Sequence, residues 1–208
     1  MTALTIEMFG DLVCPWCYLG AHRLERVLTE LGVGDRVEVK HRPFLLRPAT
    51  PPGGLDIHAE LRKRFGDLEP VFARLVTEAN KSGLDLDPRR QPFAYPTLAA
   101  HTLLRHAASR GTQRALATAL YRAHFDEARN ISDPDVLAEI AAAHGFTAEE
   151  VDALVTDPGE LARTRTETQH ASAAGITAVP VFRIGAQALA GAQPEAVLRA
   201  AITAAMPA

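Results

Sequence analysis

The alternation of apolar and polar positions predicts a strand, a helix and a second strand at the start of the chain. The apolar run Leu4–Phe9 is typical of a buried strand. Apolar residues then recur at three- and four-residue steps, at Leu19, Leu24, Val27, Leu28 and Leu31. This spacing predicts a helix that ends near Gly32. From Arg36 to Leu45, apolar positions alternate with charged ones and predict another strand. Two strands joined by a helix favour parallel pairing with a right-handed crossover.

A break rich in proline and glycine, Pro48–Gly54, separates this unit from a long segment with helical patterns only. Asp133 followed by proline, and the capping-box spacing of Thr147 and Glu150, mark two helix starts. The expected helices span Ile57–Phe65, Leu68–Ser82, Leu98–Ser109, Thr112–Phe125, Pro134–His144, Ala148–Val155 and Glu160–Ala174.

Strand patterns return near the end of the chain. Ala178–Gly185 predicts a strand, Gln187–Ala190 a second strand after a tight turn, and Gln193–Ala205 a last helix. The order is therefore βαβ, then helices, then ββα. We predict an α/β fold whose core comprises residues 1–55 and 175–208, interrupted by an all-helical insertion at residues 56–174.

Composition excludes several classes of partner. The 208 residues are 47% hydrophobic and 23% charged with a net charge of −3, which is ordinary for a soluble globular protein. Without a basic tail, nothing predicts nucleic-acid binding, and no apolar run approaches the ~20 residues needed to span a membrane. Met1–Gly10 lacks the basic start and the cleavage site of a signal peptide, so we expect a cytoplasmic protein.

Candidate chemistry lies between the first strand and the first helix, where Cys14 and Cys17 are the only two cysteines of the chain. Because the first turn of a helix carries partial positive charge, a cysteine there has its pKa lowered from about 8.5 toward roughly 3.5–7.5. Pro15 suits the first helical turn, and Trp16 would shield one side of the site. We expect an accessible Cys14 that attacks a disulfide, and a less exposed Cys17 that resolves the intermediate.

Two other interpretations of the cysteine pair are weaker. Two buried hydrophobic cysteines would seldom both fall in one strand-to-helix turn. A structural zinc site usually needs four ligands, and neither a second Cys-x-x-Cys nor a suitably spaced histidine pair follows, so we predict no metal. Asp11, three residues before Cys14, is either a helix cap or a proton relay, and capping is the commoner role.

Motifs at the two ends of the chain resemble the DsbA-like branch of the thioredoxin superfamily. Asp-x-x-Cys-Pro-Trp-Cys-Tyr-x-Gly, starting at Asp11, and Gly-Ile-Thr-Ala-Val-Pro-Val-Phe, ending at Phe182, are similar to cytoplasmic FrnE-type oxidoreductases. Those are related to 2-hydroxychromene-2-carboxylate isomerases and kappa-class glutathione transferases. The resemblance implies a thioredoxin-like core, and a cis Val179–Pro180 peptide that faces the cysteines and leaves the Val179 backbone free to pair with a substrate strand.

The same resemblance implies the function and further site residues. We expect a thiol–disulfide oxidoreductase with catalytic Cys14 and Cys17, and with substrate-binding residues Pro15, Trp16, Val179, Pro180 and His101. His101 is the last residue of the segment Pro96–His101, which corresponds to the Asn-Thr-x-x-Ala-His motif of the family. The alternative to substrate contact is a partly buried histidine whose hydrogen bonds are satisfied within the protein.

The expected partners are a disulfide- or thiol-containing protein or small molecule. No bound cofactor is required, since the redox couple is the cysteine pair; glutathione as co-substrate, or a thioredoxin, would recycle it. Whether the chain forms a homodimer is left open. The alternative function is a glutathione-dependent isomerase or transferase acting on a small aromatic or polyketide compound. Those relatives usually carry serine where Cys14 stands.

Overall fold

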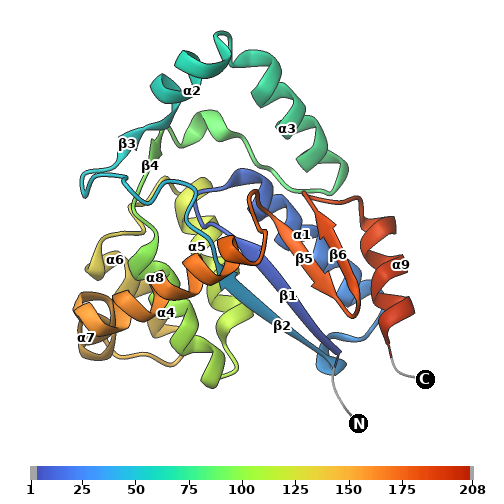
Figure 1. Cartoon of the computed structure of the whole chain (residues 1–208). Helices are drawn as coiled ribbons and strands as arrows, with labels where there is room; N and C mark the ends of the chain where they lie inside the picture. The colour runs from blue at the N-terminus through green and yellow to red at the C-terminus, as the bar shows by residue number, and fades with distance from the viewer. Residues whose placement is uncertain (1–3, 207–208) are drawn as a thin grey trace.

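A four-stranded mixed sheet forms the centre of the computed structural model, which describes residues 4–206 (Figure 1). The strand order is β2-β1-β5-β6, with β2 parallel to β1 and with β1–β5 and β5–β6 antiparallel. The strands are β1 (Leu4–Gly10), β2 (Val37–Pro43), β5 (Val181–Ile184) and β6 (Gln187–Ala190). This confirms the predicted parallel βαβ unit and the predicted hairpin near the end of the chain, whose strands are β5 and β6.

Side chains of β1 alternate between the two faces of the sheet, as the period-two geometry of a strand requires. Ile6 and Met8 lie in the main core with Phe182 of β5 and the apolar side of α1 (Pro15–Glu30). Phe9 and Val181 point to the other face and belong to a smaller apolar cluster with α8 (Pro158–Ala173). The sheet therefore has helices on both faces, with α8 crossing in front of it in Figure 1.

Every helix expected from spacing and caps is present. The remaining helices are α2 (Ile57–Phe65), α3 (Glu69–Lys81), α4 (Leu98–Ser109), α5 (Gln113–Phe125), α6 (Pro134–Ala142), α7 (Ala148–Thr156) and α9 (Glu195–Ala205). The Asp133 carboxylate caps α6, and Thr147 with Glu150 forms both hydrogen bonds of a capping box at α7. Among residues 4–206, every helix is too short or too polar to cross a bilayer.

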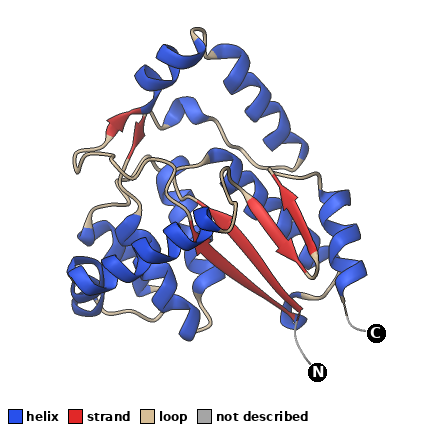
Figure 2. Ribbon diagram, viewed as in Figure 1, coloured by secondary structure: helices blue, strands red, loops and turns tan. Residues whose placement is uncertain are grey.

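The segment predicted to be all-helical also contains a small antiparallel sheet, β3 (Leu55–Asp56) with β4 (Phe93–Ala94), drawn in red at the upper left of Figure 2. Strands of two residues are too short to give an alternation pattern, which is why the sequence did not predict them. This sheet closes residues 55–94, hereafter the α2–α3 segment, at its base. The proposed division into core and insertion stays a prediction, and residues 1–3 and 207–208 of that core lie outside the described residues.

Candidate active site

The turn between β1 and α1 places Cys14 at the N-cap of the helix. The Cys14 N–H donates to the Asp11 carbonyl at 3.1 Å, and Pro15 occupies the first helical position, where its missing N–H costs nothing. The Cys14 Sγ accepts the Cys17 N–H at 3.3 Å. The first turn of α1 contains no acidic residue. Backbone dipoles and this hydrogen bond therefore both favour negative charge on the Cys14 sulfur.

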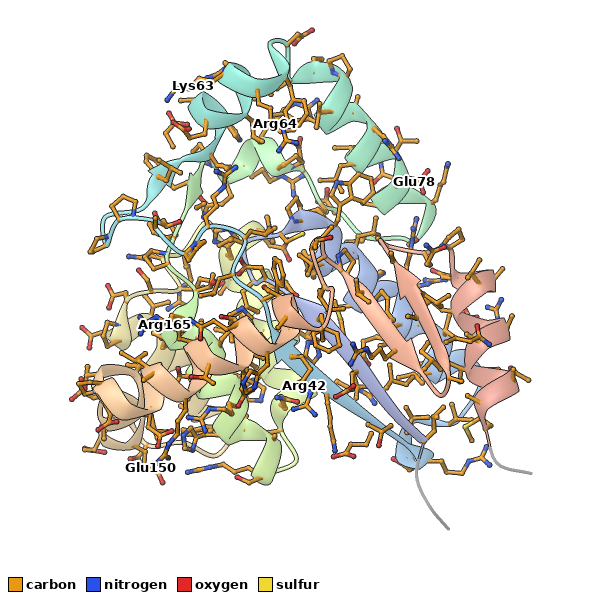
Figure 3. All side chains as sticks on the ribbon, in the orientation of Figure 1. Arg42, Lys63, Arg64, Glu78, Glu150 and Arg165 are labelled. Carbon is orange, nitrogen blue, oxygen red and sulfur yellow. The ribbon has the colours of Figure 1, made fainter. Side chains whose placement is uncertain are left out.

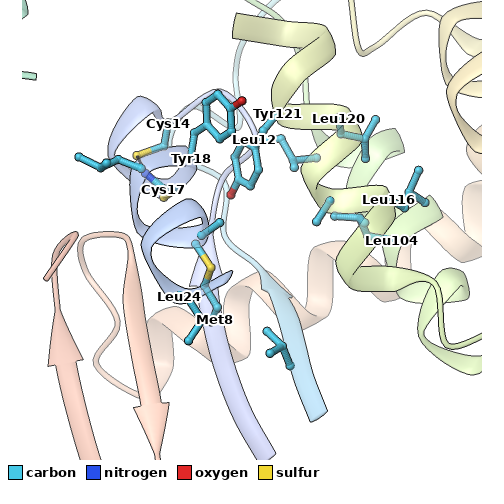
Figure 4. Close-up of a cluster of buried hydrophobic side chains, with 14 of the residues drawn as sticks. Met8, Leu12, Cys14, Cys17, Tyr18, Leu24, Leu104, Leu116, Leu120 and Tyr121 are labelled. Carbon is cyan, nitrogen blue, oxygen red and sulfur yellow. Dashed lines mark hydrogen bonds between the residues drawn. The ribbon is translucent and has the colours of Figure 1, made fainter. Parts of the chain in front are cut away.

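Cys17 lies one turn further along α1 and is fully buried, whereas Cys14 is 5% exposed (Figure 4). Both cysteines are free thiols. Burial raises the pKa of the Cys17 thiol well above its usual value, and the hydrogen bond and charge of Cys14 raise it further. The predicted order of exposure is confirmed, but Cys14 is much less accessible than expected.

Cys14 is enclosed because it lies in the wall of a pocket of about 350 Å³ that the α2–α3 segment covers. Trp16, Pro15 and Val179 belong to the same wall, so the structure brings four of the predicted site residues together. Four large apolar side chains line the pocket and are still 36% to 49% exposed: Leu46, Phe65, Val71 and Phe93. An exposed apolar patch of this kind marks an interaction site.

Charge around the pocket is positive. The Arg74 guanidinium lies 5.6 Å from the Trp16 ring centroid, and Arg47 lines the pocket. Arg64, labelled on α2 in Figure 3, lies 5.0 Å from the ring of Phe65. No carboxylate is among the described residues that line the pocket. The described lining of the pocket therefore offers cations to a substrate, whereas behind it the charge of the buried Asp11 carboxylate contributes to raising the pKa of the Cys17 thiol.

The Val179–Pro180 peptide bond is cis, as the resemblance implied. Pro180 is buried against α1: a Cβ built on Gly20 would lie 3.2 Å from the Pro180 ring. The Pro180 carbonyl accepts the Gly191 N–H at 2.7 Å. Within residues 4–206 the Val179 N–H and C=O have no hydrogen-bond partner, so the backbone beside the pocket is free.

Asp11 is not the helix cap that was predicted. Its carboxylate is buried and accepts the Leu46 N–H at 2.8 Å and the Thr97 hydroxyl at 2.7 Å. Its oxygens thus join the end of β1 to the loop after β2 and to the start of α4. The Cys14 sulfur occupies the capping position instead. Sequence spacing could not reveal this, because both partners lie far along the chain.

His101 is buried next to Asp11, with Nε2 3.5 Å from the Asp11 Oδ1. Within the described part of the chain this Nε2 has no hydrogen-bond partner, so the prediction of a satisfied histidine is wrong. His101 lines a different hollow, next to β2, and not the pocket that contains Cys14. A contact between His101 and substrate stays a prediction.

Two site residues on α5 were missed from the sequence. His124 is buried and lines the Cys14 pocket, and burial lowers its pKa to about 4. Tyr121 lies beside the cysteines in Figure 4: a Cβ on Gly10 would be 3.4 Å from both the Tyr121 hydroxyl and the Cys17 sulfur. Only the packing of α5 against α1 brings them here, and no local motif signals it.

The chain is similar to known proteins over nearly its whole length. A profile of the DSBA-like thioredoxin domain matches residues 5–203. The uncharacterized protein YwbO of Bacillus subtilis (strain 168) is 29% identical over 202 residues, 95% of each chain.

Two solved structures are also similar. For a probable DsbA oxidoreductase from Streptomyces coelicolor the TM-score is 0.85 and the identity 34%, covering 97% of this chain and 89% of that chain. The cytosolic disulfide reductase DsbM of Pseudomonas aeruginosa, solved with GSH, shares the fold: the TM-score is 0.65 and the identity 23%, covering 97% of this chain and 98% of that chain.

Proposed function

Because the chain belongs to the DSBA-like thioredoxin domain family, we propose that it is a thiol–disulfide oxidoreductase in which Cys14 attacks and Cys17 resolves. The observation that carries the proposal is the position of the Cys14 sulfur. It lies at the N-cap of α1, in the wall of an apolar pocket that also includes Val179. A thiolate, rather than a thiol, is the species that attacks a disulfide, and this position favours negative charge.

The exchange proceeds in two displacements at sulfur. The Cys14 thiolate attacks a substrate disulfide R–S–S–R′, forms Cys14–S–S–R and releases R′S⁻. The released thiolate takes the proton of Cys17, whose raised pKa has kept it a thiol until then. The Cys17 thiolate then attacks the Cys14 sulfur and releases RS⁻. Two electrons have passed to the substrate, and the chain holds a Cys14–Cys17 disulfide; the reverse sequence oxidises a dithiol.

The other predicted site residues bind the substrate in this proposal. The free backbone of Val179 pairs with an extended segment beside the substrate sulfur, Pro15 and Trp16 contact it across the pocket, and Pro180 holds Val179 in place. His101 contributes only if a substrate extends beyond the pocket toward α4. The cysteine pair is the whole redox group, so no bound cofactor is needed.

Recycling by glutathione in the cytoplasm completes the proposal. A similar structure, the cytosolic disulfide reductase DsbM, was solved with GSH. Glutathione or a thioredoxin would then reduce the Cys14–Cys17 disulfide by the same two displacements. Whether the substrate is a protein or a small molecule depends on what reaches a sulfur that is 5% exposed.

Reduction of insulin disulfides with glutathione as electron donor tests the proposal. Cys14→Ser should abolish activity while circular dichroism shows an unchanged fold, because the attacking sulfur is lost. Cys17→Ser should instead accumulate a mixed disulfide detectable by mass. Full activity in Cys14→Ser would refute the proposed role. Turnover of a small aromatic compound that survives Cys17→Ser would favour the glutathione-dependent isomerase, which needs no resolving cysteine.

A further inference from the structure

Two arginines from separate parts of the chain line a hollow of about 400 Å³ beside the Cys14 pocket. Arg47 lies in the loop after β2 and lines both cavities, so the hollow adjoins the pocket at this side chain. Arg165 lies on α8 and is labelled in Figure 3. The rest of the wall comes from the same loop, from the start of α4 and from α8.

Neither of these two arginines is neutralised within the described part of the chain. Their guanidinium groups form no ion pair and no hydrogen bond there, and only their carbonyls accept hydrogen bonds, from Thr50 and Thr168. Arg163, which is on the same helix as Arg165, differs because its guanidinium pairs with Glu160. Two cations that line one hollow repel each other, and an anion between them removes that repulsion.

The surroundings of the hollow do not supply that anion. No aspartate or glutamate is among the described residues that line it. Glu167 of α8 instead lies 3.9 Å from Arg105 and lines the separate hollow that contains His101. The Asp11 carboxylate lies behind Thr97, but it is 1% exposed and both of its oxygens accept hydrogen bonds. The hollow is therefore positively charged and open to an anionic ligand.

The groups that line the hollow suit a carboxylate on a short aliphatic stem. A guanidinium binds a carboxylate through two parallel N–H donors, which adds geometric specificity to the charge attraction. Gln169, one turn of α8 beyond Arg165, adds an amide donor to the same wall. Leu45, Pro48 and Leu98 give the hollow apolar sides, against which the methylene groups of an acidic side chain can pack.

We propose that this hollow is a subsite for an acidic side chain of a polypeptide substrate whose cysteine pairs with Cys14. Arg47 and Arg165 bind the carboxylate, while the free backbone of Val179 pairs with the extended segment beside the reacting sulfur. A ligand that fills both cavities has to span them, and an extended peptide does so within a few residues at about 3.3 Å per residue. The inference rests on the proposed function, since it needs Cys14 to form mixed disulfides.

Thiol exchange on the Cys17→Ser variant, followed by mass spectrometry, tests the inference at equilibrium. The variant is first converted to its mercaptoethanol adduct. A peptide thiol RSH then exchanges: Cys14–S–S–CH₂CH₂OH + RSH gives Cys14–S–S–R + HS–CH₂CH₂OH, with no net oxidation. The peptides are capped at both ends, and one, two or three alanines separate a cysteine from a glutamate, in either order. Each peptide has a twin with glutamine in place of glutamate, and the variant unfolded in urea corrects for the intrinsic stability of each disulfide.

The folded protein should prefer glutamate to glutamine at one or more spacings. At low ionic strength the preference should reach about fivefold or more, the effect of two exposed ion pairs, and it should fall in about 0.5 M salt. Arg47→Gln and Arg165→Gln should each reduce the preference by about twofold or more, and the double variant should abolish it. Arg163→Gln is the matched control. It removes the same charge from the same helix, but from a guanidinium that pairs with Glu160 and does not line the hollow, so the preference should stay nearly unchanged.

The outcomes separate the two claims. If Cys14 forms no adduct even with mercaptoethanol, the proposed function fails. If adducts form but every glutamate peptide equals its glutamine twin, the hollow is no subsite for a carboxylate. If the preference persists in the double variant, other cations such as Arg74 cause it, and the assignment to Arg47 and Arg165 is refuted. Both of these arginines are exposed, so neither substitution should disturb the fold, which circular dichroism checks.

Discussion

Replacing Gly20 by alanine tests how closely α1 is fitted to the cis Val179–Pro180 loop. Gly20 lies in the middle of α1 and is buried. A Cβ there would lie 3.0 Å from the ring of Phe182 and 3.2 Å from the ring of Pro180. Both neighbours are buried, and neither is the flexible end of a long side chain. The methyl group therefore has to displace one of them.

Two effects oppose each other in Gly20→Ala. Alanine stabilises a helix interior by about 0.8–1.0 kcal/mol relative to glycine. Overpacking a well-filled core costs about 1–3 kcal/mol. Because two rigid rings are already inside contact distance, we expect the packing cost to win, with a net loss of about 0–2 kcal/mol. The displaced Pro180 would also shift the Val179 backbone relative to Cys14, so activity should fall by about threefold or more.

Guanidinium unfolding and insulin reduction measure the two consequences separately. Gly53→Ala is the matched control, because a Cβ at Gly53 meets nothing within 4 Å. It should change stability by less than about 0.5 kcal/mol and leave activity intact. A Gly20→Ala protein that is about 1 kcal/mol more stable and fully active would refute the reasoning.

Two buried charged groups and a buried imidazole give further predictions. Asp11→Ala leaves the Leu46 N–H and the Thr97 hydroxyl without an acceptor. In guanidinium unfolding the free energy of unfolding should therefore fall by about 2–4 kcal/mol, and by less in Asp11→Asn. An unchanged free energy of unfolding in Asp11→Ala would contradict this. Arg23 donates to α3 and to the loop before α9, so Arg23→Ala should cost about 3–5 kcal/mol in the same assay, whereas a loss below about 1 kcal/mol would show that these bonds matter little. Burial lowers the pKa of His124 to about 4 from 6.5, so the unfolded chain takes the proton first and stability is lost as pH falls from about 6.5 to about 4. The loss attributable to this group is about 3 kcal/mol, and urea unfolding at both ends of the window should show a smaller decrease in His124→Phe than in the unchanged protein; equal decreases would contradict it.

The elements of the fold could be predicted because their signals are local. Apolar spacing marks α1, and the proline after Asp133 and the capping box at Thr147 mark helix starts that the structure confirms. The strands β3 and β4 escaped because two residues carry no periodicity. In the site, too, residues that lie in a local motif could be predicted, whereas residues brought together only by the packed fold could not.

Cys14, Cys17 and the cis Val179–Pro180 bond were found because each lies in a local motif. The role of Asp11 could not be read in the same way. Its partners are 35 and 86 residues away, and only the packed fold brings them together. His124 was missed for the same reason. The enclosure of Cys14 depends on where the α2–α3 segment lies, which no pattern within that segment specifies.

The most direct test of the roles assigned to Cys14 and Cys17 counts the thiols that react when the fully reduced chain is mixed with dithiodipyridine. This reagent releases one coloured thiopyridone per displacement. The unchanged protein should release two equivalents rapidly and end with a Cys14–Cys17 disulfide and no adduct. Cys17→Ser should release one equivalent and keep a thiopyridine adduct, and Cys14→Ser should react slowly because Cys17 is fully buried. Rapid reaction of Cys14→Ser, or a stable adduct on the unchanged protein, would contradict the assignment of attack to Cys14 and resolution to Cys17.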